Sequence, residues 1–129
     1  VLVSPEDTKY MYRLPYSWIC NEDIDFENPD FEKFPALKKV KPYITHLEHG
    51  EMLYMPEGWW HYMKYETPGF SISLRSLAGR PSNLLRGLAN VTFNRIYDNW
   101  MRRRKGQAWL DYKAEEAIRR TNKLIEQEA

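Results

Sequence analysis

The most informative stretch of this chain is residues 50–61, which read GEMLYMPEGWWH. An apolar run rich in strand-forming residues stops at Pro56, and a turn then leads into Trp59, Trp60 and His61. A histidine at the start of a strand, beside two indole rings, suits a metal ligand that is shielded from water. The same pattern also fits a surface hairpin with a core-packed tryptophan, because one histidine does not make a metal site.

Further strands are predicted on both sides of this stretch. Strand-forming residues between turn signals favour an antiparallel unit with strands at residues 40–48, 51–55, 61–66 and 70–77. In the last of these strands apolar and polar residues alternate, so Phe70, Ile72 and Leu74 would lie on one face and Ser71, Ser73 and Arg75 on the other. The pattern therefore predicts that Ser73 and Arg75 share a polar face.

The ends of the chain differ in character from this β unit. Residues 1–39 are interrupted by four prolines and predict irregular coil, with a short strand at 9–14 and a helical turn near 30–34. The opening VLV looks like the end of a strand, and without an initial methionine it suggests a fragment or a processed product. Helical spacing of apolar residues predicts one helix from residues 81–84 to the basic run at 102–105, ahead of Gly106, and a second from about 109 to 126. The chain thus divides into a β unit at 1–78 and a helical region at 79–129.

Bulk composition excludes several classes of protein. Nineteen basic and eighteen acidic residues leave a net charge of +1, so no net field favours nucleic acid or a membrane surface. No apolar run approaches the length of a membrane span, and no signal-peptide pattern opens the chain. The lone cysteine, Cys20, excludes an intramolecular disulfide and favours a reducing compartment, which predicts a cytoplasmic location.

Two further groups of side chains carry weaker signals. A strand at 40–48 would place His46 and His49 on opposite faces, which disfavours them as a ligand pair. Arg75 is a better candidate for ligand binding. If its face of the strand lines a barrel interior, the buried arginine needs an anionic partner, and a guanidinium matches a carboxylate. That partner is either an acid of the protein or a carboxylate-bearing ligand that shares the cavity with His61.

Three segments carry a resemblance to a known family. Residues 24–35 read IDFENPDFEKFP, and they are followed by the stretch at 50–61 and then by residues 70–75, FSISLR. In this order the segments resemble the cupin-like jumonji-C family over residues 1–77, and residues 81–129 resemble the helical tail of its bacterial members. The resemblance implies a mainly β plus α fold, namely the C-terminal half of a double-stranded β-helix, or jelly roll, followed by two helices.

The resemblance also implies a site. Members of this family hold Fe(II) on two histidines and one carboxylate and use 2-oxoglutarate as co-substrate. His61 matches the distal histidine, Trp59 and Trp60 match the aromatic pair before it, and Arg75, with Ser73, matches the region near the co-substrate. The arginine departs from the asparagine that a relative has there. The family's His-x-Asp/Glu pair lies upstream of the segment matching residues 1–3, so this chain would supply one of three ligands and by itself hold no catalytic iron.

These implications lead to one expected function and two alternatives. The expected function is that of an Fe(II)- and 2-oxoglutarate-dependent oxygenase, which hydroxylates a small molecule or a protein side chain. Because half a jelly roll exposes sheet edges, we expect it to pair with the upstream half of the fold or with a second copy, and the two helices to support a homo-oligomer. The alternatives are a cupin-like binding module without metal chemistry and an assembly unit that works through its helices.

Overall fold

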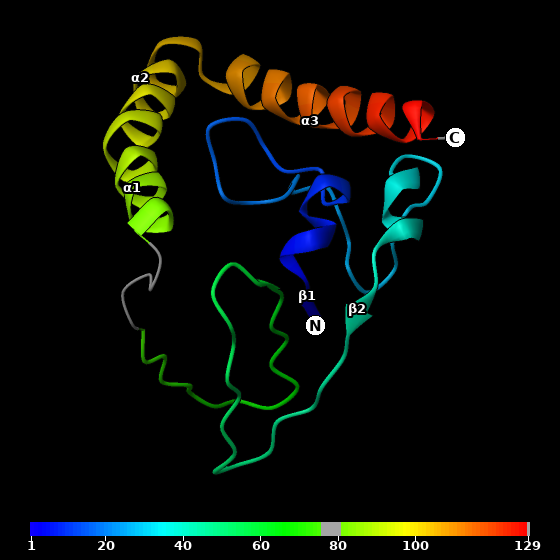
Figure 1. The fold of residues 1–129 in the computed structure, drawn as a ribbon, viewed down its shortest axis with the longest axis vertical. Coiled ribbons are helices and arrows are strands. Elements are labelled where there is room, and N and C mark those ends of the chain that lie inside the picture. The colour runs from blue at the N-terminus through cyan, green and yellow to red at the C-terminus, as the bar shows by residue number, and fades with distance from the viewer. Residues whose placement is uncertain (76–80, 129) are drawn as a thin grey trace.

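The computed structural model describes residues 1–75 and 81–128. Helices at the C-terminal end of the chain form two arms of a corner, and the N-terminal segment lies beneath the second arm (Figure 1). In chain order the elements are β1 (Leu2–Val3), the 3₁₀ helices η1 (Pro5–Tyr10) and η2 (Pro35–Lys39), β2 (Pro42–Tyr43), β3 (Trp60–His61), α1 (Pro81–Ala89), the π-helical turn η3 (Asn90–Asn94), α2 (Arg95–Lys105) and α3 (Gln107–Gln127).

The sheet is small and antiparallel, with β1 between β2 and β3. Leu2 pairs with Tyr43 on one side and with His61 on the other. Ser4 then ends β1 and caps η1, because its hydroxyl accepts the amide of Glu6 at 3.3 Å. The expectation that the chain opens with the end of a strand is therefore confirmed, and this strand is the centre of the sheet.

The predicted strands are mostly wrong in extent. Residues 9–14 contain the end of η1 and a single bridge from Arg13 to Cys20, and residues 51–55 and 70–75 form no strand. Of 40–48 and 61–66, only Pro42–Tyr43 and His61 pair, while 76 and 77 lie outside the described residues. A strand requires a neighbour for its backbone groups, and these segments find none. The fold is thus β plus α, but the described residues do not show a double-stranded β-helix.

The hydrophobic core lies between residues 10–40 and α3, not within the sheet. Tyr12 is fully buried, and its ring meets that of Phe34 edge-on at a centroid distance of 5.1 Å. The Tyr12 hydroxyl accepts the amide of Ala36 at 2.9 Å and donates to Oδ1 of Asn122 on α3 at 2.8 Å. The side chains that complete this core are Ile24, Leu37, Tyr10, Cys20, Phe26, Val40, Ile118 and Ile125. The last helix is therefore held directly against the N-terminal segment.

The two predicted helices are confirmed. The first runs from α1 through η3 to the end of α2, and Gly106, at a φ of 57°, separates it from α3. The corner is fixed by Asp98, which accepts hydrogen bonds from Trp109 Nε1 and Lys113 Nζ, both at 2.8 Å. None of the helices among the described residues has both the length and the apolar character that crossing a membrane requires.

Candidate functional site

The backbone around His61 is held firmly, while its side chain is exposed. His61 pairs with Leu2 in the sheet. Just beyond it, the amide of Tyr62 donates to the carbonyl of Val1 at 2.9 Å, and the amino group of Val1 donates to the carbonyl of Tyr62 at 2.9 Å. No hydrogen bond or ion pair within 1–75 and 81–128 engages the imidazole. Both ring nitrogens are therefore open to a ligand.

A tight turn at residues 56–59 precedes β3. Gly58 has a φ of 82°, a left-handed conformation that glycine adopts at little cost, and the amide of Trp59 donates to the carbonyl of Pro56 at 3.4 Å. The turn lies against η1, since Cγ of Pro5 is 3.5 Å from the position that a Cβ on Gly58 would take. Two prolines and one glycine thus fix where the tryptophan pair begins.

The two tryptophans contact η1 and β2. Trp60 is half-buried, and its Nε1 donates to the hydroxyl of Thr8 on η1 at 2.9 Å. Trp59 is also half-buried, and its ring lies 5.6 Å from that of Tyr43 on β2. Sequence reasoning missed both Thr8 and Tyr43, because pairing with the N-terminal strand brings them close. The indole rings therefore form a framework that holds β3 in place.

Ser73 and Arg75 lie in an exposed segment without strand structure. The three apolar residues that alternate with them are almost fully exposed, with Phe70 at 89%, Ile72 at 80% and Leu74 at 90%. Within the described part of the chain, Arg75 has no ion pair. No hydrogen bond or ion pair in the described part of the chain joins Ser73 or Arg75 to His61 or to the tryptophans.

The described residues do not form a metal site by themselves. Within 1–75 and 81–128, no three histidine, cysteine, aspartate or glutamate side chains come close enough together to hold a metal ion. The chain does contain one His-x-Glu tripeptide, His46-Leu47-Glu48, which the expectation of a single metal ligand did not take into account. It lies in an exposed segment without regular secondary structure. This tripeptide and His61 do not combine into such a group. His61 is therefore one donor without partners among the described residues.

A charged cluster follows His61 along the chain. Glu27 accepts hydrogen bonds from the Tyr62 hydroxyl at 3.2 Å and from Lys64 Nζ at 2.6 Å. The hydrogen bond to Glu27 raises the pKa of Lys64, and desolvation, with the same carboxylate, raises the pKa of Tyr62. The ring of Phe26 lies 5.7 Å from that of Tyr62. Phe26 and Glu27, from the N-terminal part of the chain, thus contact the segment that follows β3. No sequence pattern indicated these contacts.

Comparison with known proteins gives this arrangement a context. The family described as "Cupin-like domain" matches residues 1–101. Jumonji C domain-containing protein 5 of Drosophila melanogaster is 40% identical to the chain over 74 residues, which are 57% of this chain and 18% of the relative. The tRNA wybutosine-synthesizing protein 5 of Gallus gallus is 39% identical over 74 residues, which are 57% of this chain and 22% of the relative.

A third relative extends the same pattern. HSPB1-associated protein 1 of Bos taurus is 35% identical over 79 residues, which are 58% of this chain and 16% of the relative. The chain therefore spans less than a quarter of the length of these curated relatives. No solved structure matches it.

Proposed function

This chain belongs to the cupin-like domain family, and on that basis we propose that it supplies one part of an oxygenase-type site. Similarity to a Jumonji C domain-containing protein supports this class of activity. The proposed cofactor is Fe(II), with 2-oxoglutarate as co-substrate, and the proposed reaction is hydroxylation of a small molecule or a protein side chain. A reducing, cytoplasmic setting is proposed from the lone cysteine, Cys20.

His61 is the proposed metal ligand, and one observation carries this role. Its imidazole is exposed at the end of a strand whose backbone pairs with β1, and no hydrogen bond or ion pair among the described residues engages it. Because the described residues hold no complete ligand set, the other donors would come from the rest of a longer protein. The greater length of the curated relatives supports this division of the site.

The remaining predicted site residues take supporting roles in this proposal. Arg75 would pair with a carboxylate of 2-oxoglutarate, because a guanidinium matches a carboxylate with two parallel hydrogen bonds. Ser73 would donate to the same group. Trp59 and Trp60 would exclude water from the side of His61 on which they lie. The exposed position of Ser73 and Arg75 leaves them available for such a ligand.

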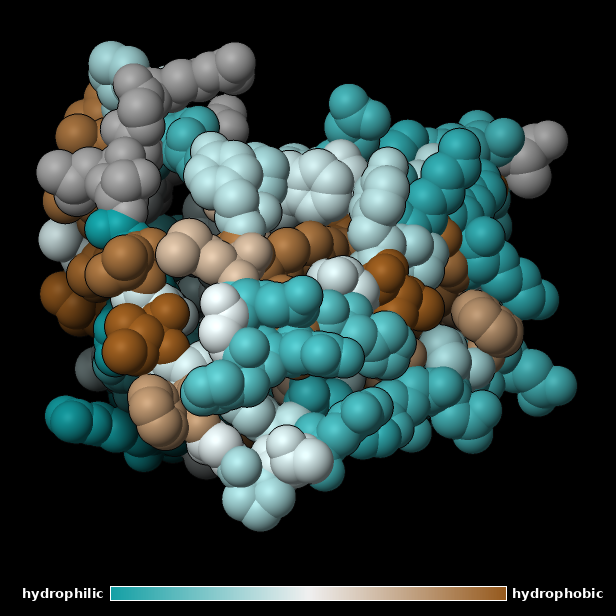
Figure 2. Space-filling model, turned by 90° about the horizontal axis from the view of Figure 1, so that it is seen from below, coloured by the Kyte–Doolittle hydropathy of each residue, from teal (hydrophilic) through white to brown (hydrophobic). Residues whose placement is uncertain are grey.

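A partner surface is part of the same proposal. Figure 2 shows hydrophobic side chains gathered at the left of the view, whereas the right is mostly hydrophilic. Large exposed apolar patches mark interaction sites in proteins. The exposed apolar residues of the first helical arm are Leu84, Leu85, Leu88, Val91, Phe93, Ile96, Tyr97 and Trp100. We propose that the upstream part of the domain or a second copy of the chain covers such residues, the second copy giving a homo-oligomer.

The experiment is turnover of 2-oxoglutarate by a protein that carries the whole domain. His61→Ala is expected to lower turnover by at least about tenfold, since the loss of a ligand weakens metal binding at least as much as the loss of a residue that hydrogen-bonds to a ligand. His49→Ala is the matched control, because His49 is equally exposed but lies in the loop before the tryptophan pair. Equal turnover in the two variants would remove His61 from the site. A folded wild-type domain without turnover would instead favour a binding module.

A further inference from the structure

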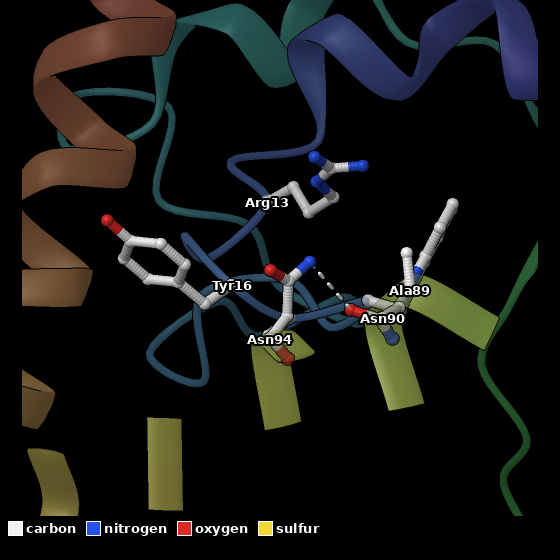
Figure 3. Close-up of a pocket in the computed structure, with 7 residues that line it drawn as sticks. Arg13, Tyr16, Ala89, Asn90 and Asn94 are labelled. Carbon is white, nitrogen blue, oxygen red and sulfur yellow. Dashed lines mark hydrogen bonds between the residues drawn. The ribbon is translucent and has the colours of Figure 1, made fainter. Parts of the chain in front are cut away.

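A hollow of about 390 Å³ lies between the N-terminal segment and the first helical arm, which consists of α1, η3 and α2. Its walls come from residues 13–18 and from the junction of α1 with α2. Figure 3 shows Arg13 on one side of this space and Asn90 and Asn94 on the other. A volume of this size lies within the range of small-molecule sites.

The first wall is a well-ordered hairpin. The amide of Leu14 donates to the carbonyl of Ile19 at 2.9 Å, and the amide of Asn21 donates to the carbonyl of Tyr12 at 2.9 Å. At its tip Tyr16 has a φ of 60°, which is costly for a residue with a side chain. The ring of Tyr16 packs 5.0 Å from that of Tyr97 on α2. The hairpin thus packs against α2 through Tyr16, which has a strained backbone conformation.

The second wall is the π-helical turn η3. Such turns are rare and are frequently found at functional sites, where the extra residue shifts side chains out of their helical register. Here Nδ2 of Asn94 donates to Oδ1 of Asn90 at 3.4 Å (Figure 3). This bond uses one of the four hydrogen-bonding positions on each amide. The Asn pair therefore retains donors and acceptors for a ligand.

Arg13 supplies a positive charge at the edge of the hollow. Its guanidinium lies 5.3 Å from the centroid of the Trp18 ring, a cation–π contact that orients the planar group. Among the described residues no carboxylate pairs with Arg13. A guanidinium that is oriented but unpaired is suited to a carboxylate from outside the chain.

We propose that this hollow binds a small planar carboxylate. Arg13 would hold the carboxylate, the Asn90–Asn94 pair would accept and donate hydrogen bonds at its other edge, and the half-exposed Trp18 would contact the flat apolar body. The site is independent of His61 and of the proposed oxygenase chemistry, because none of its lining residues belongs to β3 or to residues 70–75.

The test is an NMR titration of the ¹⁵N-labelled chain with benzoate, and with benzamide as its uncharged analogue. Benzoate is expected to shift the side-chain resonances of Arg13 and Asn94, and benzamide to bind at least about tenfold more weakly, as expected for loss of a hydrogen bond to a charged group. Arg13→Ala is expected to weaken benzoate binding by a similar factor. Asn94→Asp, which places a negative charge in the hollow, is expected to weaken it as well.

The matched control is Arg104→Ala. Arg104 also lies over a tryptophan, at 5.2 Å from the Trp100 ring, but does not line the hollow. This variant loses the same charge and the same kind of cation–π contact, and benzoate binding is expected to stay unchanged. Three results would each overturn the proposal: no benzoate binding by the wild-type chain, equal binding of benzoate and benzamide, or equal affinity of the Arg13 and Arg104 variants.

Discussion

Gly58 forms the left-handed turn that precedes β3. Its φ of 82° disfavours any side chain, whereas the contact of an added Cβ with Pro5, at 3.5 Å, is an ordinary one. Gly58→Ala is therefore expected to lower the free energy of unfolding by about 1–2 kcal/mol, measured by urea denaturation. Gly87→Ala is the control, because Gly87 lies inside α1 with nothing within 4 Å of an added Cβ.

The control substitution is expected to have the opposite sign. Alanine in a helix interior is more favourable than glycine by about 0.5–1 kcal/mol, so Gly87→Ala should raise the free energy of unfolding. If both variants changed stability equally, the left-handed turn at Gly58 would not be the reason that glycine stands there.

Single residues of the site were partly predictable from sequence. Local pattern indicated a strand at this place, and β3 is present, but it comprises Trp60 and His61, so the expectation that His61 begins the strand is wrong and His61 ends it. The contacts of the rings do not follow from local pattern. Thr8 and Tyr43 meet Trp60 and Trp59 only because β1 pairs with β2 and β3, which is a tertiary event between distant segments.

Among the elements, the corner between α2 and α3 depends on one carboxylate. Asp98 accepts hydrogen bonds from Trp109 and from Lys113, whose side chain is only 4% exposed. Asp98→Ala would leave a buried ammonium without a partner, and we expect it to lower the free energy of unfolding by about 3 kcal/mol in urea denaturation. Asp111→Ala, which removes an exposed bond to Gln107, is expected to cost less than about 0.5 kcal/mol. Similar losses in the two variants would show that Asp98 does not hold the corner.

The end of α3 is attached to the N-terminal zone in a pH-dependent way. Glu128 accepts hydrogen bonds from Lys9 at 2.6 Å, Tyr10 at 2.8 Å and Lys39 at 3.0 Å, and these, chiefly the one from Lys9, lower its pKa from 4.5 to about 2. A lowered folded-state pKa means that this stabilisation is complete above about pH 4.5 and is lost as the pH falls toward 2. Glu128→Gln should therefore lower the thermal midpoint at pH 6 but not at pH 2.

The control for this pH dependence is Glu126→Gln. Glu126 is exposed and has no ion pair among the described residues. The thermal midpoint of Glu126→Gln should therefore equal that of the wild type at both pH 6 and pH 2. If the thermal midpoints of wild type and Glu128→Gln differed by the same amount at pH 6 and at pH 2, Glu128 would not be the source of this pH dependence.

Helices were predicted well and strands poorly, for a physical reason. A helix satisfies its backbone groups within one segment, so the apolar period and Gly106 suffice to place α1 to α3 within a few residues. A strand depends on a neighbour that local sequence does not specify. Residues 70–75 alternate as a strand should, yet they pair with nothing in the described chain. The π turn at η3 had no sequence signal.

In the molecule as a whole, the stable unit joins the two ends of the chain. Residues 10–40 and α3 share the core, whereas residues 44–74 carry many exposed apolar side chains. The family resemblance over residues 1–77 implied half a jelly roll, and no sequence pattern indicated that residues 10–40 and α3 would share the core. The family is confirmed over residues 1–101, but the sheet it implies is not formed by the described residues. A partner for those apolar segments is part of the proposed function.

The proposed role of His61 is that of one ligand in a metal site completed outside the described residues. Its most direct test is the iron content, by mass spectrometry, of a purified protein that carries the whole domain. Wild type and His49→Ala are expected to hold about one iron per chain, and His61→Ala to lose at least about nine-tenths of it. Iron content in His61→Ala equal to that of the wild type would contradict the claim.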